Sequence, residues 1–353
     1  MKARYVLLAA AGAVLVTATA VVRSAAPDAI TGVWTVEPAT WKSAPARGPL
    51  VQLTLSRRHG RNGHSNHSNS VALSALKGLT AEQMSAGAAS VSFALERDAG
   101  RFAFEGSFRG GEGAGHYTFV PRPEFVAEMR NLGYAALDDE KIYSMAVLDV
   151  SRDFVKQLDA LGYSRLELDD LLSLRIHGAD PAFIRAMKDL GYDHLPVDDL
   201  VSLRIHGATP EFVREMKALG YRLSADELVS LRIHGASPEF VREMQSLASA
   251  RLSAEDLVSL RIHGATPEFV RALRTLGYER VPTEELVSMR IHGVSAEFIQ
   301  ELKALGYDHV AVDDLVSMRI HGVSPEFVRR VQARRGSVTV DRLVEMRIHG
   351  QDQ

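Results

Sequence analysis

The second half of this sequence repeats one tetrapeptide, Arg-Ile-His-Gly, seven times. A fixed period of a few dozen residues is typical of a solenoid, in which one supersecondary unit stacks on copies of itself. Few other folds tolerate such a pattern, so it constrains residues 121–353 to a repeat architecture. The tetrapeptides end at Gly178, Gly207, Gly235, Gly264, Gly293, Gly322 and Gly350.

The repeat period is 29 residues, measured from the phenylalanine that opens each copy. One step is 28 residues, because Gly-Tyr-Arg-Leu at 220–223 is one residue shorter than Gly-Tyr-Asp-His-Leu at 191–195. We therefore expect the difference in length to lie in a loop. We number the copies from one to eight by the phenylalanine that each contains: Phe125, Phe154, Phe183, Phe212, Phe240, Phe269, Phe298 and Phe327.

Each copy has the start and stop signals of two short helices. In the fourth copy Thr209 is a good N-cap, Pro210 suits the first helical position, and Gly220 suits a left-handed residue after the helix. Ser224 and Glu227 have the spacing of a capping box at the start of a second helix. Short helices are only marginally stable in isolation, so we expect the stacking of copies to stabilise them.

The apolar residues predict how these helices pack. The first helix of a copy is amphipathic, whereas the second has two apolar stripes, Leu228 with Leu231 and Val229 with Ile233 in the fourth copy. Two stripes favour a helix that is sandwiched between neighbours. The first copy, 122–151, lacks the tetrapeptide. We therefore expect it to dock on something other than a repeat.

The N-terminal residues 1–23 have the layout of a secretory signal, with basic residues, an apolar run and a small-residue cleavage site at 18–20. The run at 5–22 is also long enough for an uncleaved membrane anchor, and both readings stay open. The chain has no cysteine, which excludes disulfides and a lipoprotein anchor. We expect a periplasmic or other extracytoplasmic location, either soluble after cleavage or anchored by the N-terminal helix.

Residues 30–120 have the period-two alternation of a small antiparallel β domain. We expect one short helix at 77–84 and a sheet of about five strands. The predicted fold class is therefore α+β, a β domain followed at 121–353 by an α-solenoid of about eight helical hairpins. The expected strands lie at 32–36, 51–55, 91–95, 102–104 and 116–120.

Charge separates the two parts of the chain. Residues 1–120 contain 12 Lys or Arg and 7 Asp or Glu, whereas 121–353 contain 29 and 37. A nucleic-acid-binding repeat would have a basic stripe, and this one is net negative. The sequence therefore argues against nucleic acid as a partner.

The repeated histidines have three readings. Each follows the last turn of a helix, where the N–H groups of an imidazole can donate hydrogen bonds to the unpaired carbonyls and its positive form interacts favourably with the helix dipole. Neighbours one copy apart are too far from each other for shared zinc ligation, although a response to pH remains an alternative. We expect the arginine two residues earlier to pair with acidic residues of adjacent copies. The histidines are His177, His206, His234, His263, His292, His321 and His349.

A polar segment at 57–69 holds three further histidines, His59, His64 and His67. Histidine-rich loops can bind Zn²⁺ or Cu²⁺, which makes these residues weak candidates for a metal site. No carboxylate or thiolate accompanies them, and the arginines of the segment would repel a cation. We expect a solvated, mobile loop.

A row of tyrosines follows the glycines that end the first helices. Tyrosine at this position usually packs against the helix end. The residues beside it differ from copy to copy, as they do on the binding surfaces of repeat proteins. We take this edge as the candidate partner-binding surface: Tyr163, Arg165, Tyr192, His194, Tyr221, Arg222, Tyr278, Arg280, Tyr307 and His309.

The repeat sequence at 200–214, Leu-Val-Ser-Leu-Arg-Ile-His-Gly-Ala-Thr-Pro-Glu-Phe-Val-Arg, resembles helical repeats of uncharacterised bacterial envelope proteins. It is also similar to extracytoplasmic repeats of some antirepressor-type zinc metallopeptidase sensors, and the segment 108–116 fits the same setting. Those peptidases need His-Glu-x-x-His, which this sequence lacks. The resemblance therefore implies shared surroundings and no shared catalysis.

The sequence contains no nucleophile elbow, phosphate-binding loop or zinc-hydrolase motif, and it indicates no cofactor. We therefore expect a non-enzymatic exported scaffold that binds a protein partner in the bacterial envelope, in the setting of a membrane sensor system. The alternative is a metal- or pH-sensing envelope stress protein that uses its histidines. An enzyme with an unrecognised site in the β domain is a third reading.

Overall fold

A computed structural model describes residues 29–38, 49–59, 63–248 and 250–350 of the chain. The chain divides into two compact units, Met1–Ser151 and Arg152–Gln353. The predicted signal at 1–23, with the anchor reading at 5–22, lies outside the described residues.

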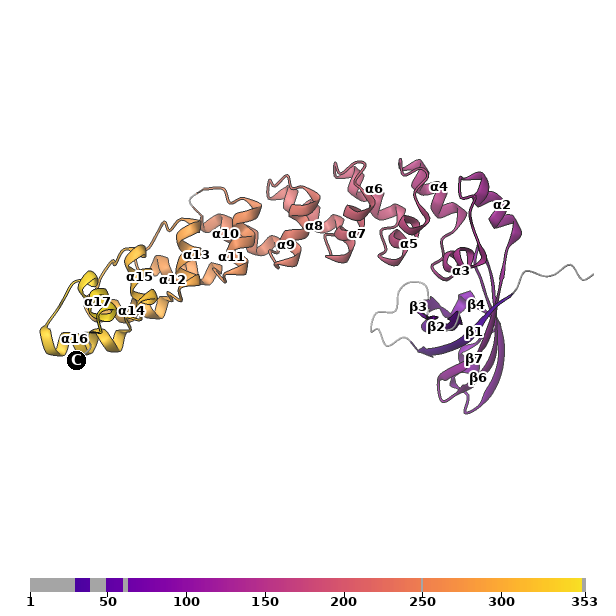
Figure 1. Ribbon diagram of the computed structural model, residues 1–353, viewed down its shortest axis with the longest axis horizontal. Coiled ribbons are helices and arrows are strands. Elements are labelled where there is room, and N and C mark those ends of the chain that lie inside the picture. The colour runs from indigo at the N-terminus through magenta and orange to yellow at the C-terminus, as the bar shows by residue number, and fades with distance from the viewer. Residues whose placement is uncertain (1–28, 39–48, 60–62, 249, 351–353) are drawn as a thin grey trace, which may run out of the picture. The chain divides into compact units, whose positions relative to one another are not determined.

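The first unit contains an antiparallel sheet (Figure 1). The sheet has seven strands in the order β3-β2-β1-β7-β6-β5-β4. Strands that are consecutive in sequence pair with each other, and β1 also pairs with β7. The α+β fold class predicted from the sequence is thus confirmed. The strands are β1 (Ile30–Pro38), β2 (Leu50–His59), β3 (Gly63–Ala72), β4 (Leu76–Lys77), β5 (Ala89–Glu96), β6 (Gly100–Arg109) and β7 (Glu112–Pro121).

Strand β3 replaces the polar loop that the sequence led us to expect at 57–69. Its residues pair with β2, so that His64 lies opposite Arg58 and His67 lies opposite Leu55. The loop prediction is wrong for the described part of this segment. Its polar side chains form hydrogen bonds with side chains of β2. Gln52 Nε2, for example, donates to Ser68 Oγ at 2.8 Å. Strand β3 can therefore form although most of its side chains are polar, because polar side-chain pairs across two strands also stabilise a sheet.

Aromatic side chains fill the core of the sheet unit. Trp34, Phe102, Phe104, Tyr117 and Phe119 are each at most 1% exposed. They come from β1, β6 and β7, which are adjacent in the sheet. Residues two apart on a strand share a face, so the alternation in the sequence produced this core.

The helix predicted at 77–84 is shorter in the structure and begins later. A 3₁₀ turn (Leu73–Ala75) leads into β4, and helix α1 covers Ala81–Ser85. Gly78 takes a φ of +95°, which ends the strand before the helix can start. Thr80 and Gln83 then form a reciprocal capping box.

The first repeat copy belongs to the sheet unit. Its helices are α2 (Pro123–Asn131) and α3 (Asp139–Val147), and α3 packs on β6 and β7. The Tyr143 hydroxyl lies 2.5 Å from that of Tyr117, and the Arg57 guanidinium covers the Tyr143 ring while pairing with Glu140. Burial raises the pKa of both phenols. As expected for a copy without the tetrapeptide, it docks on a different element.

The second unit consists, in its described residues, of seven helical hairpins. The first helices of successive copies contact one another, and so do the second helices, which gives two rows (Figure 1). First helices are α4 (Arg152–Ala160), α6 (Pro181–Asp189), α8 (Pro210–Ala218), α10 (Pro238–Leu247), α12 (Pro267–Thr275), α14 (Ala296–Ala304) and α16 (Pro325–Arg335). Second helices are α5 (Leu168–Ile176), α7 (Val197–Ile205), α9 (Ala225–Ile233), α11 (Ala254–Ile262), α13 (Thr283–Ile291), α15 (Val312–Ile320) and α17 (Val340–Ile348).

The helix boundaries match the local signals in the sequence. The Thr209 hydroxyl accepts the N–H of Phe212 at the start of α8, and Gly220 takes a φ of +83° after it. Ser224 and Glu227 form the predicted capping box of α9. The caps predicted for the fourth copy are confirmed.

Candidate functional site

The arginine of each tetrapeptide lies against an aromatic ring, and from the third copy onward it also lies against the end of a helix in the preceding copy. The Arg204 guanidinium carbon is 5.1 Å from the ring centroid of Phe183. Its Nη2 would lie 3.2 Å from a Cβ built on Gly178, the helix end of the preceding copy. We expected ion pairs with acidic residues here. At Arg204 a ring and the negative end of a helix dipole take that role. The same ring contact joins Arg175 to Phe154, Arg232 to Phe212, Arg261 to Phe240, Arg290 to Phe269, Arg319 to Phe298 and Arg347 to Phe327.

The glycine of each tetrapeptide ends its helix in the left-handed conformation. Gly235 takes a φ of +69°, and the N–H of Ala236 donates to the Leu231 carbonyl at 2.8 Å. This is a Schellman motif, so the predicted C-cap is confirmed. His234 is the C-cap residue, and its backbone N–H bonds to Ser230. Its imidazole is exposed, and the backbone carries out the capping that we had expected of the side chain.

The isoleucine of each tetrapeptide is exposed to solvent. Seven isoleucines in equivalent positions at the ends of the second helices have 54–59% of their surface exposed. We call this set the isoleucine row. It consists of Ile176, Ile205, Ile233, Ile262, Ile291, Ile320 and Ile348.

Helix α9 contacts both α7 and α11, as predicted for a helix sandwiched between neighbours, but Ile233 of its second apolar stripe is exposed. Leu228 and Leu231 are buried and share one face of the helix. Successive helical residues are about 100° apart, so Ile233 lies about 200° around the helix from Leu231. It therefore points away from the packed face. Only the isoleucine of the second stripe is a surface feature, because Val229 is half-buried.

The isoleucine row follows the row of second helices. Each of these helices contacts the next, so neighbouring isoleucines lie at roughly the 8–10 Å spacing of packed helices. Stacking explains why buried positions repeat, but it does not require an exposed isoleucine. A regular row of exposed apolar side chains is typical of an interaction surface. The histidine that follows each isoleucine forms a polar rim beside the row, and these histidines are exposed except for the half-buried His263.

The tyrosines of the predicted partner-binding edge connect successive copies. Each donates its hydroxyl to a backbone carbonyl of the following copy. Burial raises the pKa of Tyr163, Tyr192, Tyr221 and Tyr278. We call the five residues the bridging tyrosines. Their bonds are Tyr163 to Leu195 (2.8 Å), Tyr192 to Leu223 (2.7 Å), Tyr221 to Leu252 (3.0 Å), Tyr278 to Val310 (2.7 Å) and Tyr307 to Val338 (2.8 Å).

The residues beside the tyrosines shape the loops between helices. Arg165, His194 and His309 take φ values of 52–53°, and the shorter fourth copy lacks a residue at this position. The one-residue difference thus lies in a loop, as predicted. The His194 ring packs on Gly162 of the preceding copy. Arg222, on the same edge, is exposed.

The three weak metal candidates do not form a site in the described residues. His64 and His67 are three residues apart on β3, so their side chains point to opposite faces of the sheet. Burial, with the nearby charge of Arg57, lowers the pKa of His67. His59 ends β2, opposite Gly63. Across the described chain no three His, Asp or Glu side chains are grouped closely enough to hold a metal ion.

Sequence reasoning missed the isoleucine row, although a signal for it exists. The buried position two residues before it changes from Leu231 to Met289 between copies, as a packing position can. The isoleucine is the same in all seven tetrapeptides despite its exposure. A position that stays constant without being buried is a candidate for binding.

Neither a model of a known protein family nor a curated protein matches this chain. Among the described residues, each helix is too short or too polar to span a lipid bilayer.

Proposed function

We propose that this chain is a non-enzymatic exported scaffold of the bacterial envelope that binds a protein partner along the isoleucine row. The observation that carries the proposal is the exposure of seven isoleucines that stacking does not require. Burying an isoleucine fully contributes about 1.5–3 kcal/mol, so each half-exposed residue offers about 1 kcal/mol. Several copies must act together to offset the cost of association. An extended partner that contacts several copies fits this surface best.

The proposed setting is extracytoplasmic, near a membrane sensor system. Its support is the layout of residues 1–23 and the absence of cysteine. The net negative charge of 121–353 favours a protein partner over nucleic acid. Fractionation of cells that express the tagged chain tests this setting, and a cytosolic location would contradict it. Association with the membrane fraction that disappears when 5–22 is deleted would identify the anchor reading.

The alternative function, metal or pH sensing, would use the histidines beside the isoleucine row. The pH form would act by placing a positive charge next to each isoleucine whenever the neighbouring imidazole is protonated. Capture of the partner that changes between pH 5.5 and 7.5, and that stops changing when His234, His263 and His292 become Gln, would support it.

The test of the scaffold proposal compares three sets of substitutions. Changing Ile233, Ile262 and Ile291 together to Gln keeps side-chain length and helix propensity but removes the apolar surface. We expect this triple variant to lose capture of envelope proteins from solubilised membranes, with an unchanged circular dichroism spectrum and melting temperature. Full capture by this variant would contradict the proposal.

Two control sets identify the binding edge. One reverses the charge of Arg165 and Arg222 beside the bridging tyrosines, and the other reverses exposed arginines of the first helices. We expect both to matter less than the isoleucine set, because neither changes the apolar row. If the first control abolishes capture instead, the tyrosine edge is the partner surface. The second control consists of Arg214, Arg242 and Arg271.

A further inference from the structure

The fifth copy lacks a bridging tyrosine. The sequence Ala248-Ser249-Ala250-Arg251-Leu252 stands where the third copy has Gly-Tyr-Asp-His-Leu. Ser249, which lies outside the described residues, thus takes the place of the tyrosine in the alignment. Ala248 takes the place of the glycine and has an extended backbone after α10. The copy has therefore lost both the turn and the aromatic ring.

Because the fifth copy has no bridging tyrosine, one backbone carbonyl of the sixth copy lacks the tyrosine hydroxyl that donates to its equivalents elsewhere. In the five copies with a bridging tyrosine, the acceptor is the carbonyl that precedes the second helix of the next copy. The residue at that position in the sixth copy is Val281, which is followed by a proline as Leu195 is in the third. The chain has no tyrosine in the aligned position to donate to it.

A pocket of about 440 Å³ lies between the fifth and sixth copies, and Val281 lines it. Its inner wall is apolar and includes Met244, Leu260 and Leu273, each at most 2% exposed. An apolar cavity of about 150 Å³ is enough to hold benzene. The pocket thus has room for an aromatic ring at the interface where other copies place one.

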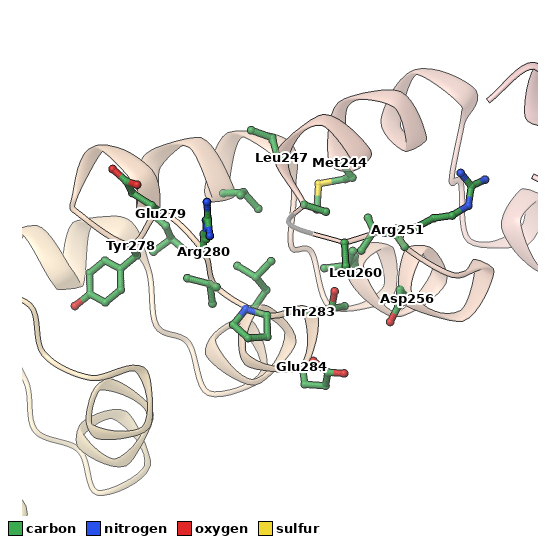
Figure 2. A pocket seen from close by; sticks show the side chains of 18 residues that line it. Met244, Leu247, Arg251, Asp256, Leu260, Tyr278, Glu279, Arg280, Thr283 and Glu284 are labelled. Carbon is green, nitrogen blue, oxygen red and sulfur yellow. The ribbon is translucent and has the colours of Figure 1, made fainter. Parts of the chain in front are cut away.

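Arg280 at this pocket corresponds to an arginine that covers a ring elsewhere. Its equivalent in the fifth copy, Arg251, lies 4.4 Å from the ring centroid of Tyr221 in the copy before. Figure 2 shows Arg280 among the lining side chains, whereas Tyr278 and Arg251 point away from each other toward opposite ends of the view. Tyr278 reaches the next copy, so it does not fill the pocket. Arg280 is exposed and available to cover a ring supplied from outside.

We propose that this pocket binds the side chain of a tyrosine from a partner polypeptide. The phenol ring would lie against Met244 and Leu273 and under Arg280, and its hydroxyl would donate to the Val281 carbonyl. The five bridging tyrosines are the precedent within the same molecule for this ring and this bond. The inference does not rest on the isoleucine row, and the two can fail separately.

The first test uses 4-methylphenol as the probe and the unmodified chain. We expect it to shift the NMR signals of the Met244, Leu260 and Leu273 methyl groups in a saturable manner. Toluene lacks the hydroxyl and should bind about five- to tenfold more weakly, the usual effect of one net hydrogen bond. No shift of these signals up to the solubility limit of 4-methylphenol would overturn the proposal, and so would equal binding of toluene.

Substitutions then locate the site. Ser249→Tyr should restore the bridge, abolish binding of the probe and raise the melting temperature by a few degrees. The matched control Ser246→Tyr adds the same ring at an exposed position of α10 and should leave binding unchanged. Arg280→Ala should weaken binding about two- to fivefold, while Arg222→Ala should not. Binding that persists in a folded Ser249→Tyr chain would overturn the assignment. The titration of the unmodified chain needs no variant and stands if Ser249→Tyr does not fold.

A last comparison identifies the source of the ring. A blocked Gly-Tyr-Gly peptide should displace 4-methylphenol, and a blocked Gly-Phe-Gly peptide should do so about five- to tenfold less well. Displacement by neither peptide would show that the pocket takes a free phenol, which would overturn the polypeptide part of the proposal. Loss of partner capture in the triple isoleucine variant with unchanged 4-methylphenol binding would show that the two surfaces are independent.

Discussion

Tyr192 offers the most direct test of how the copies hold together. Its hydroxyl donates to the Leu223 carbonyl at 2.7 Å, and its half-buried ring lies between the third and fourth copies. Tyr192→Phe removes only the bond, and we expect a loss of about 1 kcal/mol in the free energy of unfolding. Tyr192→Ala also removes the ring. Complete burial of such a ring would give a loss of about 3–5 kcal/mol, so a half-buried one gives about 2–3 kcal/mol.

The assay is urea unfolding followed by circular dichroism at 222 nm, combined with hydrogen exchange. Because copies contact only their neighbours, faster exchange should be confined to the third and fourth copies before it spreads. Asp193→Asn is the control. It removes an exposed ion pair with Lys188 at 3.1 Å, and because exposed pairs contribute little, its stability should stay near that of the unmodified chain. The reasoning fails if Tyr192→Ala is as stable as this control, or if its faster exchange is uniform over the unit.

Three further predictions concern caps, the sheet unit and pH. Gly235→Val should lower the free energy of unfolding by at least about 1–2 kcal/mol, since φ is +69° and the new Cβ would lie 3.2 Å from an arginine. His234→Gln should lower it by less than about 0.5 kcal/mol. Equal melting temperatures of the two variants would refute the role of Gly235 as the helix end. Tyr143→Phe should cost about 1–3 kcal/mol by leaving the buried Tyr117 hydroxyl unpaired, whereas the double Phe variant should recover most of it in a double-mutant cycle. Burial raises the pKa of four bridging tyrosines. The stability that their protonated hydroxyls contribute is therefore complete below the unfolded-state pKa of about 10 and is lost as the pH rises through the folded-state pKa. The melting temperature should fall above about pH 10, and it should fall less steeply in Tyr192→Phe.

Local chemistry made the helix ends predictable. Thr209, Gly220 and Ser224 act on backbone groups within a few residues, so their roles follow from the sequence alone. The loop position of the missing residue was predictable for the same reason. The alternation in β5, β6 and β7 likewise indicated the sheet without knowledge of its partners.

Features that depend on a neighbouring element were not predictable in this way. The strand character of His64 and His67 depends on β2, which supplies both the backbone bonds and the polar partners. The exposure of Ile233 depends on which side of α9 the next copy covers. The acceptor of Tyr192 lies 31 residues away, and only the stacking of the copies brings Leu223 to it.

The hydrogen bonds that join one copy to the next in the described residues each span about one repeat period, between 24 and 32 residues along the chain. Arg347 reaches 25 residues back to Gly322, Lys217 reaches 27 back to Leu190, and Tyr307 reaches 31 forward to Val338. A recombination event that inserts or deletes one whole period would therefore recreate the same donors and acceptors at the new junction. The gene can change the number of copies, and with it the number of exposed isoleucines, without any compensating mutation. The pocket between the fifth and sixth copies needs residues of both, so it would be kept only where these two copies stay adjacent.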